Sequence, residues 1–225
     1  MTNAPDLFDS APAPSKGYTA KDIEVLEGLE PVRRRPGMYI GGTDERALHH
    51  LAAEILDNSM DEAVAGHASR IEFELAADNV LTVRDNGRGI PIDPHPKFKN
   101  KSALEVIMTT LHAGGKFGGK AYDTSGGLHG VGASVVNALS EWMEVEVFRD
   151  KHGHKLRFER GKPAGKLTGT GAANRRGTAV SFKPDAQIFG KEAHFSPAVL
   201  YRMARSKAYL FRGVEIRWKC DPALI

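Results

Sequence analysis

A chain of 225 residues, 41% of them hydrophobic, can bury the core of one large domain or of two small ones. Its formal charge of +3, from 31 basic and 28 acidic residues, is well below the basic excess of a module that mainly binds DNA phosphates. The single cysteine, Cys220, excludes an intramolecular disulfide, and the absence of a long apolar run or a secretory signal predicts a cytoplasmic protein without a membrane span.

The N-terminal part is expected to contain a disordered arm followed by two helices. Residues 1–17 are rich in Ala, Pro, Ser and Asp, and residues 18–225 are expected to form one domain. Apolar residues at helical spacing predict a first helix from Ala20 to about Glu30, ended by the solvated turn Arg33-Arg34-Arg35-Pro36. A longer helix follows, capped by Thr43 or Asp44 and ended by Gly66, with a buried stripe of Leu48, Ala52, Ile55, Ser59 and Ala63.

The rest of the chain mixes strands and helices. Alternating apolar residues at 71–75 and 81–83, separated by a turn at 77–79, predict a β-hairpin. Helices are expected at 102–112, 133–139 and about 196–210, and strands at 143–149, 154–160, 177–183 and 213–219. Because no βαβ unit repeats at a regular length, the pattern predicts an α/β (α+β) two-layer sandwich, a mixed sheet with helices on one face.

One face of the long helix is acidic. Glu54, Asn58, Asp61 and Glu62 fall within an arc of about 100°. A solvated face is the ordinary interpretation of such an arc. Two glycine-rich turns elsewhere, however, can supply the remaining parts of a phosphate site.

The first of these turns is Asp85 to Pro91, directly after the hairpin's second strand. A carboxylate at a strand end, followed by glycines, suits recognition of an adenine amino group, although Asp-Asn-Gly is also common turn chemistry. The second runs from Ser125 to Gly132 into a helix, within a stretch that has eight glycines in nineteen residues. Its backbone amides favour an anionic phosphate, and the alternative is a flexible loop.

Two better-known phosphate motifs do not fit. The run from Gly114 to Lys120 nearly satisfies a P-loop, but Ala121 stands where the Mg²⁺-binding Ser or Thr belongs, and a helix rather than a strand precedes it. No Rossmann glycine motif opens a helix after a strand.

The order of these motifs resembles a known family. A Glu-x-x-x-Asn helix, an Asp-x-Gly-x-Gly turn and a lid ending in Gly-x-x-Gly-x-Gly resemble the Bergerat-fold (GHKL) ATPases, which include type II topoisomerases, Hsp90, MutL and histidine kinases. The segments EVLEGLEPVRRRPGMYIGG (24–42), EILDNSMDEAVAGH (54–67), LHAGGKF (111–117) and SGGLHGVGASVVNALS (125–140) are similar to the ATPase domain of bacterial gyrase and topoisomerase IV B subunits. The resemblance spans about residues 18–220, and 93–117 with Tyr122-Asp123-Thr124 favours topoisomerase IV over gyrase.

The resemblance implies catalytic and metal-binding roles. Glu54 would be the general base for the attacking water, and His50 would orient it. Asn58 would hold Mg²⁺ through its side-chain oxygen. Asp85 would accept the adenine amino hydrogen, and Thr178 would share a water with it.

The remaining residues that the resemblance implies surround the nucleotide. Arg88, Gly89 and Pro91 would line the adenine pocket, Arg149 would flank its mouth, and Asp61 and Glu62 are counted with the nucleotide-binding residues. Tyr18 would reach into the site of the partner protomer. The residues that would wrap the triphosphate are Gly114, Gly115, Lys116, Tyr122, Leu128, His129, Gly130, Val131 and Gly132, with Lys116 offsetting γ-phosphate charge.

These roles imply an ATP- and Mg²⁺-dependent enzyme that powers DNA strand passage together with the A-type subunit of topoisomerase IV. In that family a transducer domain and a metal-binding domain follow the ATPase domain, so the chain is expected to be a fragment that hydrolyses ATP slowly and is largely monomeric alone. Self-dimerisation on ATP binding and binding of aminocoumarin inhibitors are implied too. A B-type gyrase subunit, a histidine kinase and a non-catalytic nucleotide- or DNA-binding module stay open as alternatives.

Overall fold

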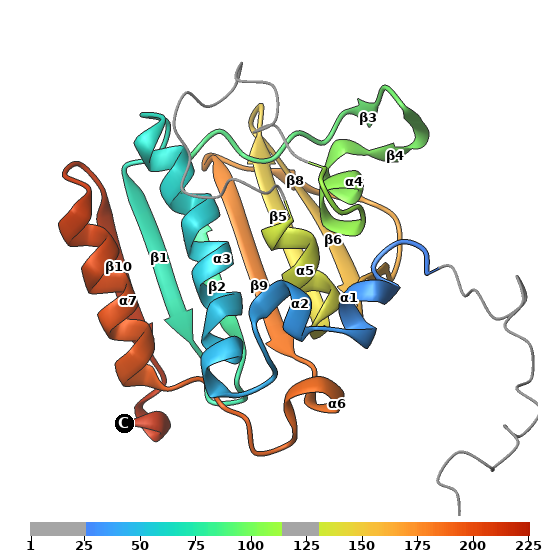
Figure 1. Cartoon of the computed structure of the whole chain (residues 1–225). Coiled ribbons are helices and arrows are strands. Elements are labelled where there is room, and N and C mark those ends of the chain that lie inside the picture. Colours follow the sequence, from blue (N-terminus) through green and yellow to red (C-terminus); the bar gives the residue numbers. More distant parts are fainter. Residues whose placement is uncertain (1–25, 114–130) are drawn as a thin grey trace, which may run out of the picture.

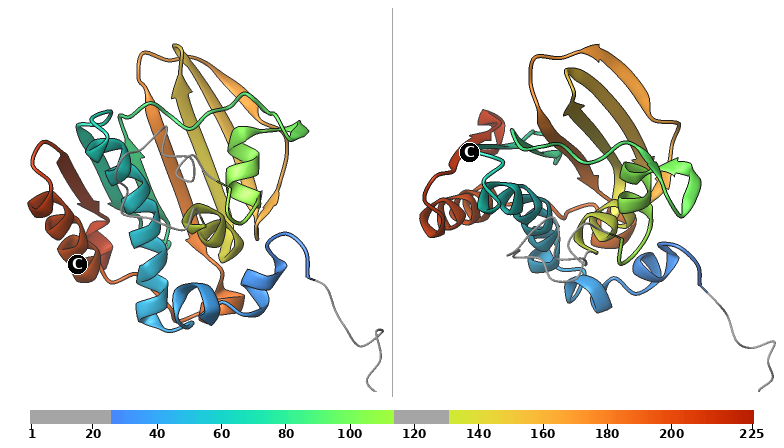
Figure 2. Two further views of the ribbon diagram at one scale, coloured as in Figure 1. Left: turned by 45° about the horizontal axis from the view of Figure 1, so that its top comes forward. Right: turned by 90° about the horizontal axis from the view of Figure 1, so that it is seen from above.

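The sheet is the frame of the molecule, which a computed structural model describes over residues 26–113 and 131–225. Its strands lie in the order β10-β1-β2-β9-β5-β6-β7, and β8 pairs with β6. The pairing of β1 with β10 is parallel and the other pairings within this sheet are antiparallel, so the predicted mixed sheet is confirmed. Figures 1 and 2 show the helices gathered on one face of the sheet.

Strands and helices follow one another along the chain in the intermixed order expected. The sheet strands are β1 (Arg70–Leu75), β2 (Leu81–Asp85), β5 (Ser140–Arg149), β6 (His152–Glu159), β7 (Lys162–Pro163), β8 (Thr168–Ala172), β9 (Gly177–Pro184) and β10 (Glu215–Cys220). A separate hairpin pairs β3 (Pro94–His95) with β4 (Phe98–Ser102). The helices are α1 (Glu30–Arg34), α2 (Gly37–Ile40), α3 (Glu45–Val64), α4 (Ala103–Thr109), α5 (Gly132–Ala138), α6 (Ala186–Phe189), α7 (Pro197–Leu210) and the 3₁₀ turn Pro222–Leu224.

The long helix α3 lies across the middle of the helical layer. The Asp44 side chain caps it by accepting a hydrogen bond of 2.9 Å from the Ala47 amide, which is one of the two caps expected from the sequence. The expected buried stripe is confirmed, and Leu51 and Leu56 are also fully buried. The helix is therefore enclosed around most of its circumference, so the expected acidic arc is not a solvated face, and Asp61 within it is only 2% exposed.

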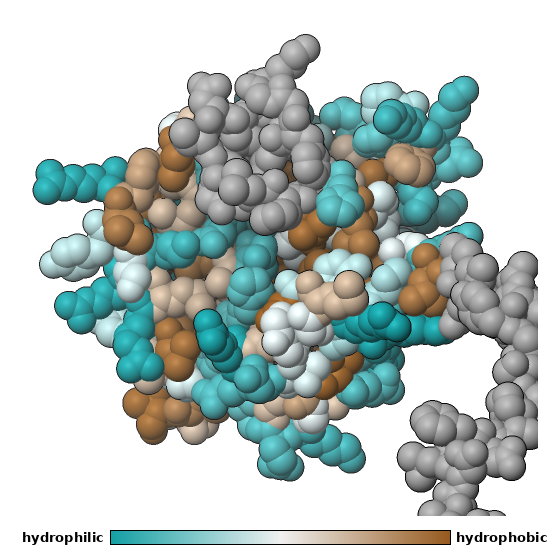
Figure 3. All heavy atoms as spheres, viewed as in Figure 1, coloured by the Kyte–Doolittle hydropathy of each residue, from teal (hydrophilic) through white to brown (hydrophobic). Residues whose placement is uncertain are grey.

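The two faces of the sheet differ in chemistry because side chains alternate along each strand. On β1, Ile71, Phe73 and Leu75 are buried beneath the helices, whereas Arg70, Glu72 and Glu74 stand on the other face. Figure 3 shows the helix-bearing side of the molecule as a mixture of hydrophilic and hydrophobic residues. Nowhere in residues 26–113 and 131–225 is a helix long and apolar enough to cross a membrane.

The C-terminal strand β10 completes one edge of the sheet. It pairs in parallel with β1 over six residues, from Arg70 opposite Glu215 to Leu75 opposite Cys220. The Trp218 ring packs on Phe73 with 5.3 Å between ring centroids. The first and last strands described are thus neighbours.

The first helix differs most from its sequence-based expectation. Residues 26–29 are not helical, and the helix begins at Glu30 and includes Arg33 and Arg34, two of the three arginines that were expected to end it. Pro31 suits the first turn of a helix because backbone N–H groups there have no hydrogen-bond partner within the helix, so the N–H that proline lacks is not needed. The expected residues 20–25 lie outside the described part of the chain.

Arg33 does not lie in a solvated turn either, so the prediction is wrong for this residue, whereas Arg34 and Arg35 are exposed. Its guanidinium donates to the Ala138 carbonyl oxygen at 2.6 Å and to the Asp185 carboxylate at 2.7 Å. Arg160 donates to the same carboxylate oxygen at 2.9 Å. Burial alone would raise the pKa of Asp185, but the hydrogen bonds from the Gln187 amide, Arg33 and Arg160 outweigh it and hold that pKa below its usual value.

Other boundaries differ by a few residues. Helix α4 ends at Thr109 rather than 112, and the short elements α2, α6, β3, β4, β7 and β8 were not expected. The remaining expected strands, the hairpin and helix α7 are confirmed within a few residues.

Candidate functional site

Helix α3 places three of the expected site residues one turn apart. His50, Glu54 and Asn58 are four residues from one another and so lie along one side of the helix. The Nε2 atom of His50 is 3.1 Å from Oε1 of Glu54, whose side chain is 32% exposed. This geometry leaves the Glu54 carboxylate accessible while the imidazole restrains it.

The start of α5 lies against the same carboxylate. A side chain at Gly132 would collide with Oε2 and Cδ of Glu54. With any other residue at this position, the Glu54 carboxylate would have to shift away from α5. The contact joins two of the sequence motifs, the acidic helix and the end of the glycine-rich stretch.

Asp85 lies at the end of β2, facing α3. Its Oδ1 atom accepts hydrogen bonds from the amides of Gly87 at 2.8 Å and Thr178 at 3.3 Å. Its Oδ2 atom accepts one from the Ser59 hydroxyl at 3.2 Å. Desolvation raises the pKa of Asp85 to about 6 despite the two amide hydrogen bonds, which lower it.

The residues after Asp85 are tied to α3 by a second carboxylate. Glu62 accepts from the Arg88 backbone amide at 2.9 Å, from Nε at 3.2 Å and from Nη2 at 2.7 Å. A side chain on Gly87 would meet Oε2 of Glu62 at 2.7 Å, so glycine is needed there. Glu62 therefore positions Arg88, a task that its place in an acidic arc did not suggest.

The far side of this turn is held by β5 and β9. Arg149 donates from Nη1 to the Gly89 carbonyl oxygen at 2.9 Å. The Thr178 hydroxyl accepts from the Ile90 amide at 3.2 Å. Gly89 has a φ of +78°, a conformation that side chains disfavour, and Pro91 follows directly.

Sequence reasoning missed one residue of this arrangement. Ser59 was assigned to the buried stripe of α3, and it is buried, but its hydroxyl serves Asp85. A small polar residue within an otherwise apolar stripe was the available signal. Nothing in the local sequence identified its partner 26 residues away.

Part of the expected site cannot be compared with the structure. Val131 and Gly132 are described, as are Asp61 and Pro91. The expected residues outside the described ranges are Tyr18, Gly114, Gly115, Lys116, Tyr122, Leu128, His129 and Gly130. Within the described ranges, no three His, Cys, Asp or Glu side chains gather into a group able to hold a metal ion.

Comparison with protein families assigns the fold to a class. Residues 43–188 match the model of the histidine kinase-, DNA gyrase B- and HSP90-like ATPases. The match covers α3, the Asp85 turn and the start of α5. The chain therefore belongs to this ATPase family.

The individual relatives are topoisomerase subunits. The chain is 69% identical over 216 residues to the B subunit of DNA topoisomerase 4 from Caulobacter vibrioides, a match that covers 96% of the chain and 31% of that protein. It is 56% identical to the B subunit of DNA gyrase from Synechocystis, over 88% of the chain and 18% of the relative. The chain thus spans less than a third of the length of these relatives.

A solved structure supports the same assignment. The 43K ATPase domain of Thermus thermophilus gyrase B, in complex with an aminocoumarin, superposes with a TM-score of 0.76 at 47% sequence identity. The match covers 85% of this chain and 48% of that one. The α/β fold with a mixed sheet is therefore that of a gyrase B ATPase domain.

Proposed function

We propose that this chain binds and hydrolyses ATP as the ATPase domain of a B-type topoisomerase IV subunit. In the complete enzyme, ATP turnover would drive the passage of one DNA duplex through another together with an A-type subunit. Relatives named as the B subunit of topoisomerase 4, at 58–69% identity, support this choice. The cytoplasm is the compartment that this role requires.

The adenine end of the site is proposed at Asp85. One carboxylate oxygen is already used by two backbone amides, and among the described residues the Ser59 hydroxyl donates to the other. That second oxygen has capacity for the amino group of adenine. Arg88, Gly89, Pro91 and Thr178 would border the base, and Arg149 its entrance.

The phosphate end is proposed at α3 and the start of α5. Glu54 would take the proton of the water that attacks the γ-phosphate, with His50 restraining its carboxylate. Asn58, one turn further on, would offer an amide oxygen to Mg²⁺, which usually keeps waters and phosphate oxygens as its other ligands. Bound there, Mg²⁺ would neutralise charge on the triphosphate. Asp61 and Glu62 would support this wall, and the glycine-rich segment with Lys116 and Tyr122 would cover the phosphates.

The observation that carries the proposal is the contact between Glu54 and Gly132. It brings the Glu54 carboxylate of α3 next to the last glycine of the glycine-rich motif, which is also the first residue of α5. Phosphoryl transfer needs mainly positioning and charge neutralisation around an in-line water. An accessible carboxylate beside a phosphate-binding segment meets that requirement.

The test is the variant Glu54→Gln. We expect unchanged ATP affinity by calorimetry and a turnover lowered by at least about 10²-fold, the usual scale for losing a general base. The matched control is Glu45→Gln, in the exposed first turn of the same helix, which should hydrolyse ATP at the original rate. Equal turnover in both variants would remove Glu54 from the mechanism.

Testing the proposed A-type partner and DNA strand passage requires more of the B-type protein than this chain. A B-type gyrase subunit is the alternative, favoured by the identity to gyrase B sequences and by the gyrase B structure. Joining this domain to the remainder of its protein and adding the A-type partner would decide between them. Decatenation without supercoiling supports topoisomerase IV, and negative supercoiling supports gyrase.

ATP-dependent dimerisation and aminocoumarin binding are parts of the same proposal. Tyr18 would reach the partner's site when two copies of the domain close. The neighbouring gyrase B structure contains an aminocoumarin. A competitive shift of the ATP binding isotherm by such a compound would place both ligands in one pocket of this chain.

A further inference from the structure

The face of the sheet without helices has a cavity of its own. A hollow of about 280 Å³ lies over β1, β2 and the start of β9. The register places Glu72, Arg84 and Ala179 side by side on this face, opposite to Val83 beneath the helices. Asp85 at the end of β2 and Thr178 at the start of β9 line this hollow as well, so it adjoins the place where α3 lies against Asp85.

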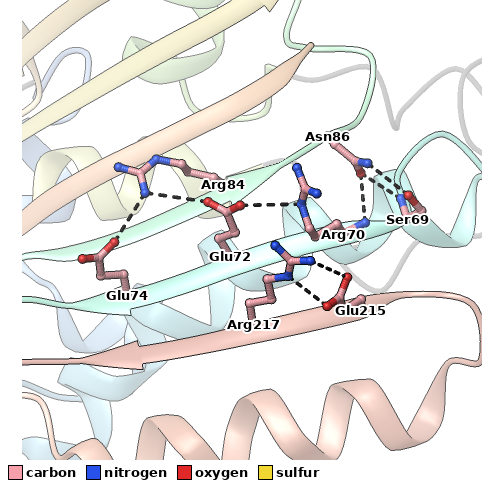
Figure 4. Close-up of polar contacts among 8 residues, drawn as sticks. All are labelled: Ser69, Arg70, Glu72, Glu74, Arg84, Asn86, Glu215 and Arg217. Carbon is pink, nitrogen blue, oxygen red and sulfur yellow. Dashed lines mark hydrogen bonds and ion pairs between the residues drawn. The ribbon is translucent and has the colours of Figure 1, made fainter. Parts of the chain in front are cut away.

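Two arginines of the hollow come from neighbouring strands. Nε of Arg70 is 3.5 Å from Oε1 of Glu72, and Nη1 of Arg84 lies 4.0 Å from Glu72 and 3.5 Å from Glu74. Figure 4 shows these side chains standing next to one another on β1 and β2. All three separations exceed the 2.7–2.9 Å of a charge-assisted hydrogen bond. Both guanidinium groups can therefore donate to a phosphate oxygen at a shorter distance than to these carboxylates.

Two more arginines enter from the loop before β9. The guanidinium of Arg175 stacks on the Phe148 ring at 3.7 Å, and its Nη2 atom is 3.8 Å from Glu146. Stacking fixes the plane of the group and leaves its N–H edge available. Arg176 donates to the carbonyl oxygens of Asn86 and His67, which carry no net charge and leave its positive charge in place.

We propose that this arginine pocket, formed by Arg70, Arg84, Arg175 and Arg176, binds a phosphate group. Its lining has four arginines against two acids, Glu72 and Asp85, and Glu74 and Glu146 approach Arg84 and Arg175 from outside the lining, so a phosphate would replace these longer ion pairs. Arginine forks match the oxygen geometry of phosphate, and charge-assisted hydrogen bonds to it are stronger than neutral ones. The phosphate can belong to a DNA backbone or to a small phosphorylated molecule, because both present the same oxygens.

The arginine pocket shares Asp85 and Thr178 with the wall of the proposed ATP pocket, but none of its four arginines is assigned to ATP binding, and its test needs no turnover. The Nε–Hε NMR signals of arginine side chains are followed while the chain is titrated with inorganic phosphate, or with a short DNA duplex, at constant ionic strength. We expect saturable shifts for Arg84 and Arg175. In the double variant Arg84→Gln with Arg175→Gln, the remaining signals of the pocket should require at least tenfold more ligand.

The matched control lies on the same sheet face. Arg217 is paired with Glu215 at 2.9 and 3.2 Å and does not line the cavity, so Arg217→Gln should bind like the original chain. In the duplex titration, the double variant should also lower the slope of log affinity against log salt by about 1 to 2, because each phosphate contact contributes about 0.9.

Saturation by duplex at lower concentration than by phosphate supports a DNA backbone as the source. Saturation by inorganic phosphate alone supports a small phosphorylated molecule. The proposal is overturned if neither ligand gives saturable shifts at Arg84 and Arg175 in the original chain, or if the double variant binds with unchanged affinity. Either result leaves the proposed ATP hydrolysis unaffected.

Discussion

Replacing Asp85 by asparagine tests the proposed adenine contact by changing one atom. Two backbone amides, from Gly87 and Thr178, donate to Oδ1 and demand an oxygen at that position. The introduced amide group must therefore turn its NH₂ toward the Oδ2 position. There it would face the amino group of adenine, donor against donor.

The size of the effect follows from these contacts. The variant loses an accepted hydrogen bond to a charged group and leaves a donor without an acceptor, and the second of these costs about 1–3 kcal/mol. A total near 3 kcal/mol corresponds to a loss of affinity of about 10²-fold. The fold should survive, because the Ser59 hydroxyl can reverse its role and accept from the new NH₂.

Calorimetry with ATP measures the loss of affinity, and thermal melting checks the fold. The variant Ser59→Ala is the matched control, because it removes the other group on Oδ2 and leaves the carboxylate in place. It should weaken ATP binding by less than tenfold. If Asp85→Asn binds ATP within about fivefold of the original chain, the carboxylate does not contact adenine.

Three further results are expected. Desolvation raises the pKa of Asp85 from 3.8 to about 6, so the contribution of Asp85 to stability is fully present below pH 3.8 and falls by up to about 3 kcal/mol as pH rises through 6. Denaturant unfolding of Asp85→Asn, which cannot titrate, should lack this loss, and parallel pH profiles of the two proteins would refute the assignment. Asp185→Ala removes the buried partner of two arginines and should lower the free energy of unfolding by about 3 kcal/mol. The control Arg34→Ala, which removes an exposed ion pair, should change it by less than about 1 kcal/mol. Similar free energies of unfolding for the two variants in urea would contradict this expectation. Gly132→Ala should reduce ATP turnover at least tenfold by displacing Glu54, and a full rate would mean that α5 can move away without consequence.

The sequence was sufficient for features that depend on local pattern. The alternation of Ile71, Phe73 and Leu75 predicted a strand with one buried face, and the cap expected at Thr43 or Asp44 predicted the start of α3. These signals are short-range, because period and capping are set by residues within one or two turns. The mixed sheet followed from the order of such elements.

Features that depend on distant partners were not predictable in the same way. Arg33 looked like part of a solvated basic run, but its partner Asp185 is 152 residues away. Glu62 looked like one of several acids on a helix until the fold placed Arg88 against it. Charge and spacing along the chain do not state which opposite charge will fold onto a residue.

In the candidate site, too, some residues were predictable from sequence motifs and others depended on distant partners. The motifs identified Glu54, Asn58 and Asp85 as a group through resemblance to a family, and the structure places them on α3 and at the adjoining end of β2. Ser59 was missed because its role appears only when β2 lies against α3. The roles of these residues stay predictions until the variants are measured.

The parallel pairing of β1 with β10 makes the order of synthesis matter. Arg70 and its partner Glu215 are separated by most of the domain, so β1 emerges from the ribosome long before the strand that will cover its outer edge. Until then its row of free amides and carbonyls can template the addition of a foreign strand. A nascent or truncated chain that stops before Glu215 should therefore aggregate, and strand β10 protects the folded sheet against that outcome.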